Sequence, residues 1–180
     1  MAKIKYKAPK GYQDATAYLR VANAAAAIEF YKAAFGAKEK YRLTMPGGTA
    51  VGHAELWFGS TLVMLSDEFP DMGIVGPKRL GGVSGLIALY VADADAVFER
   101  AIAAGAQVKR ALTDEFYGDR TGQLEDPFGQ IWSIQTRMED IKPKAMQKRL
   151  DAMGQAATTS RAKAKPKTKS KAKAKAKAKK

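Results

Sequence analysis

The sequence contains no cysteine and only one histidine, His53, among its 180 residues. Without cysteine the chain can form no disulfide, no thiolate nucleophile and no Cys-based zinc or iron–sulfur site. With one imidazole per chain, no metal site that needs two or more histidines can form within it. These absences exclude cysteine chemistry and polyhistidine metal centres from a single chain.

Long apolar runs are also absent. No stretch approaches the roughly 20 apolar residues that a membrane span needs. The N-terminal sequence MAKIKYKAPK has no apolar signal core. We therefore expect a protein without membrane attachment, located in a bacterial-type cytoplasm.

Positive charge is abundant but unevenly distributed. The chain has 31 Lys and Arg against 18 Asp and Glu, a net charge of +13, and residues 161–180 supply +11 of it without any acid. Residues 1–160 are thus nearly neutral, with 20 basic and 18 acidic side chains, and they are long enough to bury a core. The basic positions of the C-terminal segment are Arg161, Lys163, Lys165, Lys167, Lys169, Lys171, Lys173, Lys175, Lys177, Lys179 and Lys180.

We interpret residues 155–180 as a disordered tail, because lysine at every second position leaves no face to bury. The segment resembles the Lys/Ala/Pro tails of linker histones and of some bacterial nucleoid proteins. Its charges favour contact with DNA or RNA phosphates, without base specificity because no aromatic residue can stack on bases. Two interpretations stay open: nucleoid-associated binding of nucleic acid, which we favour, and a solvated tail without a partner.

The rest of the chain repeats one pattern at an offset of 70 residues. The clearest matches are Gly48 with Gly118, Glu55 with Glu125, and Phe58 with Phe128. Each copy begins with an alternating segment (residues 14–21 in the first), continues with a helix after Asn23 or Asp93, and ends in three short alternating segments. The pattern predicts an α+β fold of two tandem βαβββ units, at about residues 14–66 and 84–136.

Three further segments flank or connect these units. Residues 1–11 are expected to form an N-terminal arm, and residues 67–82 a Gly/Pro-rich connector. Residues 139–154 are expected to form a C-terminal helix, with Pro143 in its first turn.

The two units resemble the vicinal oxygen chelate superfamily, the group of glyoxalase, bleomycin-resistance and dioxygenase proteins, in its PhnB-like branch. The segments that carry the resemblance are YLRVANAAAAIEFYKAAFGAK, GHAELWFG, MLSDEFPDMG and YGDRTGQLEDPFGQIWSI, within a domain at residues 12–138. The resemblance implies that the mixed sheets curve around a cup that holds a small molecule or a metal. It also implies a homodimer with paired cups.

In metal-dependent members of that superfamily, the ligands come from the first and last strands of each unit. Carried over to this sequence, the four positions are Thr16, Val63, Leu86 and Ser133. Valine and leucine cannot bind a metal, and an isolated Thr or Ser hydroxyl is a poor ligand. We therefore expect no cofactor and no glyoxalase I activity.

His53 and Glu55 lie two residues apart in the expected strand 50–58, so their side chains share one face. If the intervening apolar residues meet the helices, both polar side chains face the cup, where Glu55 would orient the imidazole as a base. The alternative is a hydrogen-bonded pair on a wet sheet face, without a catalytic role. On the first interpretation, alanine at either position weakens ligand binding with little loss of stability.

The same alternation places further polar side chains on the cup face or at its mouth. Arg120 is suited to an anionic group of a ligand, or alternatively pairs with a neighbour such as Asp119 or Glu125. The candidate ligand-binding residues are Tyr18, Arg20, Tyr117, Arg120, Ser133 and Gln135.

Three hypotheses for the function follow. The leading one is a metal-independent small-molecule binding protein of the glyoxalase/bleomycin-resistance type. The second is a metalloenzyme of the same fold, a lyase, isomerase or dioxygenase, that holds a divalent metal through unusual ligands such as His53 and Glu55. The third is a protein of this fold that acts at nucleic acid through its tail. Neither the ligand nor a reaction can be named from the sequence.

Overall fold

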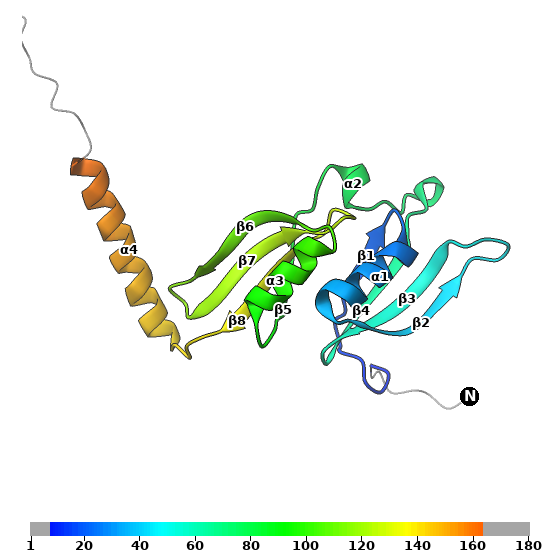
Figure 1. Ribbon diagram of the computed structural model, residues 1–180, viewed down its shortest axis with the longest axis horizontal. Helices are drawn as coiled ribbons and strands as arrows, with labels where there is room; N and C mark the ends of the chain where they lie inside the picture. The colour runs from blue at the N-terminus through cyan, green and yellow to red at the C-terminus, as the bar shows by residue number, and fades with distance from the viewer. Residues whose placement is uncertain (1–7, 164–180) are drawn as a thin grey trace, which may run out of the picture. The chain divides into compact units, whose positions relative to one another are not determined.

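Two copies of one βαβββ arrangement follow each other along the chain (Figure 1). The computed structural model describes residues 8–163, with side chains to residue 156. Contacts divide the chain after Asp140, and the two parts are described separately.

The helices and strands of the first part have the following bounds. The first copy consists of β1 (Tyr18–Val21), α1 (Ala24–Phe35), β2 (Lys38–Thr44), β3 (Val51–Phe58) and β4 (Thr61–Asp67). The second consists of β5 (Ile87–Tyr90), α3 (Ala94–Ala103), β6 (Gln107–Asp114), β7 (Asp119–Glu125) and β8 (Ile131–Arg137). Between the copies lie the 3-10 turn η1 (Pro70–Met72) and the short helix α2 (Pro77–Leu80).

Each copy forms one four-stranded mixed sheet. The strand orders are β1-β4-β3-β2 and β5-β8-β7-β6, with the first strand of each copy parallel to the last and the other pairs antiparallel. The predicted α+β fold of two tandem βαβββ units is therefore confirmed. β1 and β5 are the edge strands that begin each sheet, and β1 is shorter than the alternating segment 14–21 from which it was predicted.

The two longer helices of this part begin at the residues that their sequences indicate. The side chain of Asn23 accepts a hydrogen bond from the backbone N–H of Ala26, and Asp93 does the same for Ala96, each at 3.0 Å. Helix α1 ends at Gly36, whose φ of 68° lies in the left-handed region that glycine adopts without strain. These caps fix where each helix starts to cover its sheet.

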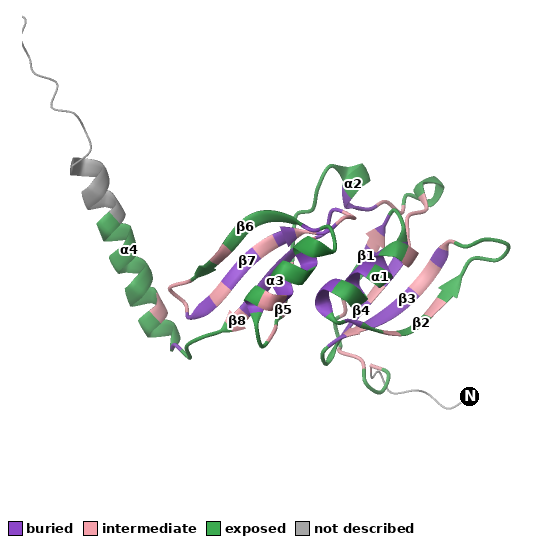
Figure 2. Ribbon diagram, in the orientation of Figure 1, coloured by how far each residue is buried: buried purple, intermediate pink, exposed green. Residues whose placement is uncertain are grey.

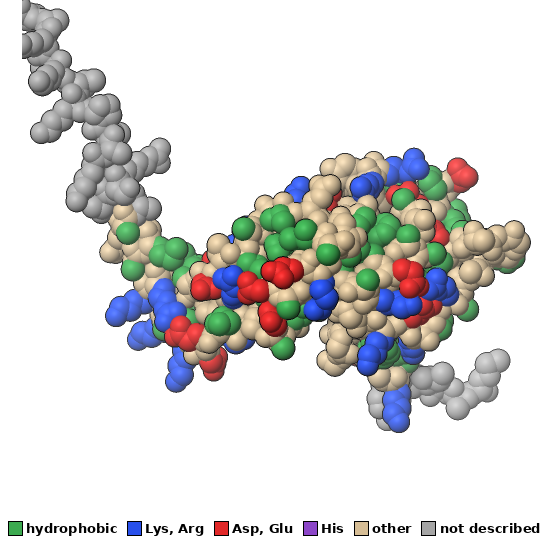
Figure 3. Space-filling model, in the orientation of Figure 1, with side chains coloured by type: hydrophobic (Ala, Val, Ile, Leu, Met, Phe, Trp, Pro, Cys, Tyr) green, Lys and Arg blue, Asp and Glu red, His purple; other side chains and the backbone are tan. Residues whose placement is uncertain are grey.

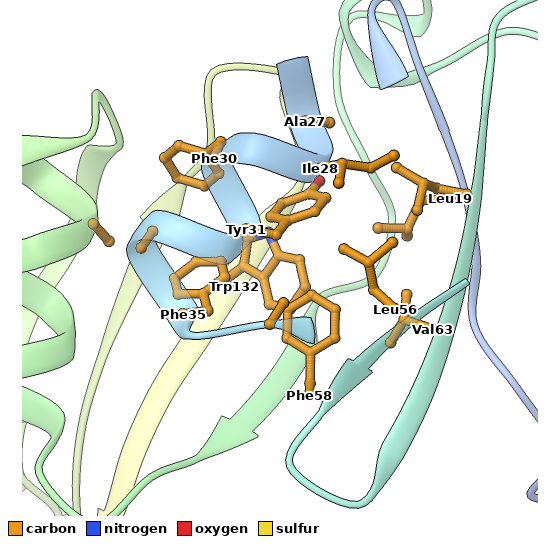
Figure 4. Packing of buried hydrophobic residues seen from close by; sticks show 14 of the residues in the cluster. Leu19, Ala27, Ile28, Phe30, Tyr31, Phe35, Leu56, Phe58, Val63 and Trp132 are labelled. Atoms are coloured by element: carbon orange, nitrogen blue, oxygen red, sulfur yellow. The ribbon is translucent and has the colours of Figure 1, made fainter. Parts of the chain in front are cut away.

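One hydrophobic core joins the helix-facing sides of both sheets (Figures 2 and 4). Trp132 of β8 is fully buried, and its ring centroid lies 4.7 Å from that of Phe35 on α1 and 5.3 Å from that of Phe58 on β3. Buried aromatic pairs at these distances add to the area that they remove from water. The opposite face of each sheet is therefore left outside this core, and six of the candidate site residues lie there: Tyr18, Arg20, His53, Glu55, Ser133 and Gln135.

The strand register corrects the constant offset of 70 residues. Tyr18 of β1 pairs with Met64, whereas Ala88 of β5 pairs with Ser133, so the last strands correspond at an offset of 69. Met64 in turn pairs with Glu55, and Ser133 with Gln123, so β3 and β7 correspond at an offset of 68. The spacing changes because the second copy has a shorter helix and turns of different lengths.

The second part of the chain contains α4 (Pro143–Lys163), which begins with Pro143 in its first turn as predicted. It extends nine residues beyond the expected end at residue 154, to Lys163. Alanine, which recurs in this stretch, has the highest intrinsic helix propensity and favours the continuation of the helix. The predicted tail beyond Lys163 lies outside the described residues.

Candidate ligand-binding site

The open face of the first sheet carries four of the eight candidate residues. We define this face by Tyr18, Arg20, Lys40, Tyr41, His53, Glu55 and Trp57. Strand β3 creates it by alternation: Ala54, Leu56 and Phe58 are buried in the core, whereas His53 and Glu55 point to the other side. Glu55 is nevertheless only 2% exposed, because neighbouring side chains enclose it.

Glu55 accepts hydrogen bonds from four side chains. The donors are the hydroxyl of Tyr12 (2.8 and 2.7 Å to the two oxygens), Lys40 Nζ (2.8 Å), the hydroxyl of Tyr41 (2.8 Å) and His53 Nε2 (3.3 Å). Burial by itself raises the pKa of Glu55, but the hydrogen bonds from Lys40, Tyr12, Tyr41 and His53 outweigh it and lower the pKa to about 2. Glu55 is thus a fixed carboxylate with its oxygens occupied, and not a free base.

Both ring nitrogens of His53 are engaged as well. Nε2 faces Glu55, and Nδ1 lies 2.8 Å from the hydroxyl of Tyr18 on the neighbouring part of the face. The rings of Tyr18 and Tyr41 flank the imidazole, with centroids 5.5 and 5.7 Å away. His53 therefore links the enclosed carboxylate to the more exposed tyrosine.

Arg20 lies two residues beyond Tyr18 on the same face of β1. Its guanidinium carbon is 3.9 Å above the centre of the Tyr18 ring, a cation–π contact, and Nη1 donates to Ser66 Oγ at 3.2 Å. Among the described residues, Arg20 forms no ion pair with a carboxylate, unlike Arg42, Arg120 and Arg137. Its positive charge is thus available to a ligand.

Tyr18 and Arg20 also line a hollow of about 410 Å³ beside β1, which we call the edge pocket. Its other walls come from α2, the connector and the start of β5. The edge pocket is lined by Ala17, Tyr18, Leu19, Arg20, Val75, Pro77, Leu80, Gly82, Val83, Ser84, Gly85, Leu86, Ile87 and Gln130. Arg20 is the one charged residue in this lining, and most of the others are apolar. Such a pocket suits a molecule with an apolar body and one anionic group.

The corresponding face of the second sheet is polar but differently built. Thr121 Oγ1 lies 3.1 Å from Ser133 Oγ and 3.5 Å from Gln135 Oε1, so the predicted pair Ser133 and Gln135 share this face. All three side chains are buried. The two hydroxyls and the Gln135 amide oxygen are therefore engaged with one another. The open face of the first sheet, by contrast, carries charged and aromatic side chains that could contact a ligand.

Arg120 does not lie at the mouth of a cup. On β7 it shares the helix-facing side with Gly122 and Leu124, and its guanidinium pairs with Asp95 of α3 (2.7 Å) and Asp114 (2.9 Å). The alternation of β7 turns this side chain away from Thr121, so the structure places it among carboxylates and not on the face where a ligand contact was expected. Its partners also differ from the neighbours proposed. Tyr117 lies in the turn after β6, where its ring packs edge-on against Phe116 at 5.1 Å.

The register also changes one of the four family ligand positions. Val63 is 4% exposed and lies in the core, whereas Met64 occupies the place in β4 that Ser133 occupies in β8. A metal at these positions would meet a thioether, a leucine and hydroxyls, which do not fit a hard or borderline divalent cation. His53 and Glu55 fit no better, because the Lys40 ammonium already occupies the carboxylate. Within residues 8–163, no cluster of three or more His, Cys, Asp or Glu could hold a metal ion.

Three partners of Glu55 were missed from the sequence: Tyr12, Lys40 and Tyr41. Tyr41 pairs directly with Glu55 across the β2–β3 hairpin, so the turn at residues 46–48 could have indicated it. Lys40 lies at an irregularity in the register between Glu39 and Tyr41, and it reaches a face that simple alternation would deny it. Tyr12 precedes β1 and carries no periodic signal.

Replacing Glu55 by Gln is expected to lower the free energy of unfolding at pH 7 and to reduce the fall of that free energy as the pH is lowered. Since the folded-state pKa lies below the ordinary value of 4.5, the native state binds fewer protons than the unfolded chain, so the stabilisation is present above pH 4.5 and lost as pH falls toward about 2. We expect a loss of about 2 kcal/mol at pH 7, less than the full shift because Lys40 and His53 are partly exposed. Urea unfolding at several pH values measures it.

The control for this prediction is Glu29→Gln, which removes an exposed carboxylate paired with Lys32 and Arg42. That variant should retain the acid transition of the wild type. Equal stability of Glu55→Gln and wild type at pH 7 would show that the four donors do not stabilise the charge.

The described part of the chain contains no helix both long and apolar enough to cross a membrane. A family model for the Glyoxalase/Bleomycin resistance protein/Dioxygenase superfamily matches residues 13–134. The uncharacterised protein Mb0911c of Mycobacterium bovis is 40% identical over 140 residues, which cover 76% of this chain and 91% of that protein.

Solved structures show the same fold. PA1353 of Pseudomonas aeruginosa is similar with a TM-score of 0.56 and 25% identity, over 71% of this chain and 99% of that one. The PhnB protein of Bacillus cereus is similar with a TM-score of 0.56 and 18% identity, over 69% and 99% of the two chains.

Proposed function

The chain belongs to the Glyoxalase/Bleomycin resistance protein/Dioxygenase superfamily, and we propose that it binds a small, largely apolar molecule with an anionic group in the edge pocket. The observation that carries this proposal is Arg20. It is the one charged side chain of an otherwise mainly apolar hollow of about 410 Å³, and no carboxylate neutralises it within the described residues. An uncompensated guanidinium beside apolar walls favours an anion that brings its own apolar surface.

The proposed binding needs no metal. The donor sets at the family positions and at His53 and Glu55 do not fit a divalent cation, and Arg20 supplies a positive charge by itself. Native mass spectrometry of the full chain, purified without chelators, should reveal a retained organic molecule and no stoichiometric nickel, zinc or iron. About one metal per chain, lost in the variant His53→Ala, would instead support the metalloenzyme hypothesis.

A homodimer would complete the surroundings of the edge pocket. Within residues 8–163, no further strand pairs with β1 or β5 at the edge of its sheet. Tyr18, Leu86 and Tyr90, on or beside these strands, are 39%, 45% and 56% exposed. Unpaired edges with large apolar side chains favour association with another copy. Sedimentation should then give twice the chain mass of 19.5 kDa.

Binding of an aromatic sulfonate tests the pocket and its charge together. We expect 8-anilinonaphthalene-1-sulfonate to bind the wild type with a rise in fluorescence, and Arg20→Gln to weaken this binding about tenfold, because a charged hydrogen bond contributes about 1.5–3 kcal/mol. The uncharged analogue N-phenyl-1-naphthylamine should bind both proteins alike. Titrations of both dyes, followed by fluorescence, measure the effect.

The matched control is Arg79→Gln, which removes an exposed arginine of α2 that is paired with Glu68 and does not line the pocket. It should leave both affinities unchanged. Equal loss of sulfonate binding in the two variants would mean that general positive charge attracts the dye, and the proposed pocket would be rejected.

A second function, nucleic-acid binding through the C-terminal segment, is favoured by the charge distribution. Residues 161–180 carry eleven positive charges and no negative one. On the face of the molecule in Figure 3, by contrast, acidic and basic side chains are interspersed and form no large patch of one sign. We therefore propose that any attachment to DNA or RNA, and any nucleoid location, depends on this segment and not on the folded body.

A further inference from the structure

Tyr18 connects two features of the site. It lines the edge pocket, and its hydroxyl lies 2.8 Å from Nδ1 of His53. Neither His53 nor Glu55 is part of the pocket lining. A ligand in the edge pocket would therefore meet the tyrosine, with the histidine behind it.

The direction of the two hydrogen bonds that link Tyr18, His53 and Glu55 follows from the charge of Glu55. A carboxylate can only accept, so Nε2 of His53 must carry the proton that lies between it and Glu55 Oε1. In the neutral imidazole the other nitrogen, Nδ1, is then an acceptor, and the Tyr18 hydroxyl donates to it. Tyr18, His53 and Glu55 thus form the arrangement in which an imidazole, oriented by a carboxylate, activates a hydroxyl group.

We propose that Tyr18 is the group of this site that exchanges a proton with the bound molecule, with His53 as its relay and Glu55 as the positioning residue. The proposal rests on the function proposed above and adds chemistry to it. When Tyr18 takes a proton from the ligand, its own hydroxyl proton passes to Nδ1 of His53, which becomes an imidazolium held by the Glu55 carboxylate. The reverse transfer returns the proton to the ligand, so no other reactant is needed.

The surroundings favour this transfer at Tyr18. The Arg20 guanidinium, 3.9 Å from the centre of the Tyr18 ring, stabilises negative charge that develops on the phenol oxygen. Tyr90 offers a contrast on the second sheet. It is more exposed (56% against 39%), and it too has an arginine nearby, since Arg137 Nη2 donates to its hydroxyl at 3.4 Å. That hydroxyl donates to the carboxylate of Asp119 at 2.9 Å and has no imidazole partner. Tyr90 is therefore a built-in reference for a tyrosine that has an arginine neighbour but no histidine relay.

The first test uses the single histidine of the chain. Nitrogen-15 NMR of the full-length protein reports the tautomer of His53 without overlap, and we expect the neutral imidazole to carry its proton on Nε2, with Nδ1 free. The Nδ1 signal should shift in Tyr18→Phe, which removes only the donor hydroxyl. A proton on Nδ1, or an unchanged signal in Tyr18→Phe, would overturn the relay.

The second test measures the reactivity of Tyr18 with N-acetylimidazole. The phenol oxygen attacks the acetyl carbon while the phenol proton passes to His53. The bond to the imidazole leaving group then breaks, and the leaving nitrogen takes up the proton that His53 had accepted, so that neutral imidazole departs. Peptide mapping by mass spectrometry then gives the acetylation rates of Tyr18 and Tyr90 in the same sample. We expect Tyr18 to react faster, and His53→Gln to slow it on the order of 10²-fold while the rate at Tyr90 stays unchanged.

The variants Glu55→Gln and His53→Gln distinguish a failure of the proposed proton relay from a failure of the proposed pocket. Glu55→Gln should slow acetylation of Tyr18 and change the tautomer of His53, whereas a purely structural carboxylate would leave the tautomer unchanged. An equal rate at Tyr18 in wild type and His53→Gln would reject the relay, whatever the outcome of the dye titrations. Loss of dye binding with an intact tautomer and intact reactivity would reject the pocket alone.

Discussion

Removing residues 164–180 is expected to abolish binding of the protein to duplex DNA of arbitrary sequence. The deletion takes away nine lysines and leaves α4 intact to Lys163. Binding by the full chain should weaken steeply with salt, by about 0.9 log units per log unit of salt for each phosphate contacted. Base substitutions in the DNA should have little effect, because lysine contacts to phosphate carry no sequence information. Gel shifts at rising salt compare the two proteins.

A variant of full length with the same nine lysines replaced by glutamine is the matched control, since it keeps chain length and changes only charge. It should bind as poorly as the truncated protein. Equal binding by the full and truncated chains would assign the affinity to the folded body. If no protein binds at low salt, the segment has no role with nucleic acid.

The fold was predictable because its signals are local and repeated. Alternation of apolar and polar residues marked the strands, and Asn23 and Asp93 marked the helix starts at which their side chains indeed cap the backbone. The repeat then supplied the architecture. What alternation cannot supply is the number of residues in each turn, and a difference of one or two there changes which residues correspond.

The ligand position assigned to Val63 illustrates this limit. A shift of one residue in β4 moves a side chain from the open face of the sheet into the core, where Val63 lies with the helix-facing residues. The same dependence on register explains why Glu125 does not correspond to Glu55: the pairing places Gln123 there instead. The acidic residue of the open face therefore has no acidic counterpart in the second copy.

The composition of the site depended on contacts that sequence spacing does not encode. His53 and Glu55 were recognised as neighbours on one face, but the donors that enclose Glu55 come from β2 and from the segment before β1. They turn an expected catalytic carboxylate into a buried anchor, and they make its replacement costlier than expected. The proposed proton-exchanging position is instead Tyr18, which the sequence assigned only to ligand binding.

Replacing Asp126 by Ala is expected to cause the largest loss of stability of any change considered. This buried carboxylate, 3% exposed, accepts hydrogen bonds from the Tyr31 hydroxyl (2.8 Å), Trp132 Nε1 (2.9 Å) and two backbone N–H groups of its own turn. It thereby ties α1 of the first copy to β8 of the second. Each buried donor left without a partner costs about 1–3 kcal/mol, so we expect a loss of about 4 kcal/mol or more in urea unfolding.

A double substitution distinguishes the loss of this tie from a general disturbance of the turn. Tyr31→Phe removes one donor and should cost about 1 kcal/mol by itself. Combined with Asp126→Ala, however, it should raise stability above that of Asp126→Ala alone, because the buried hydroxyl that lacks a partner is gone. Additive losses in the double variant would mean that Tyr31 and Asp126 stabilise the fold independently. The favourable coupling is expected because Tyr31 and Asp126 meet in the buried interior, where a polar group without a partner is costly.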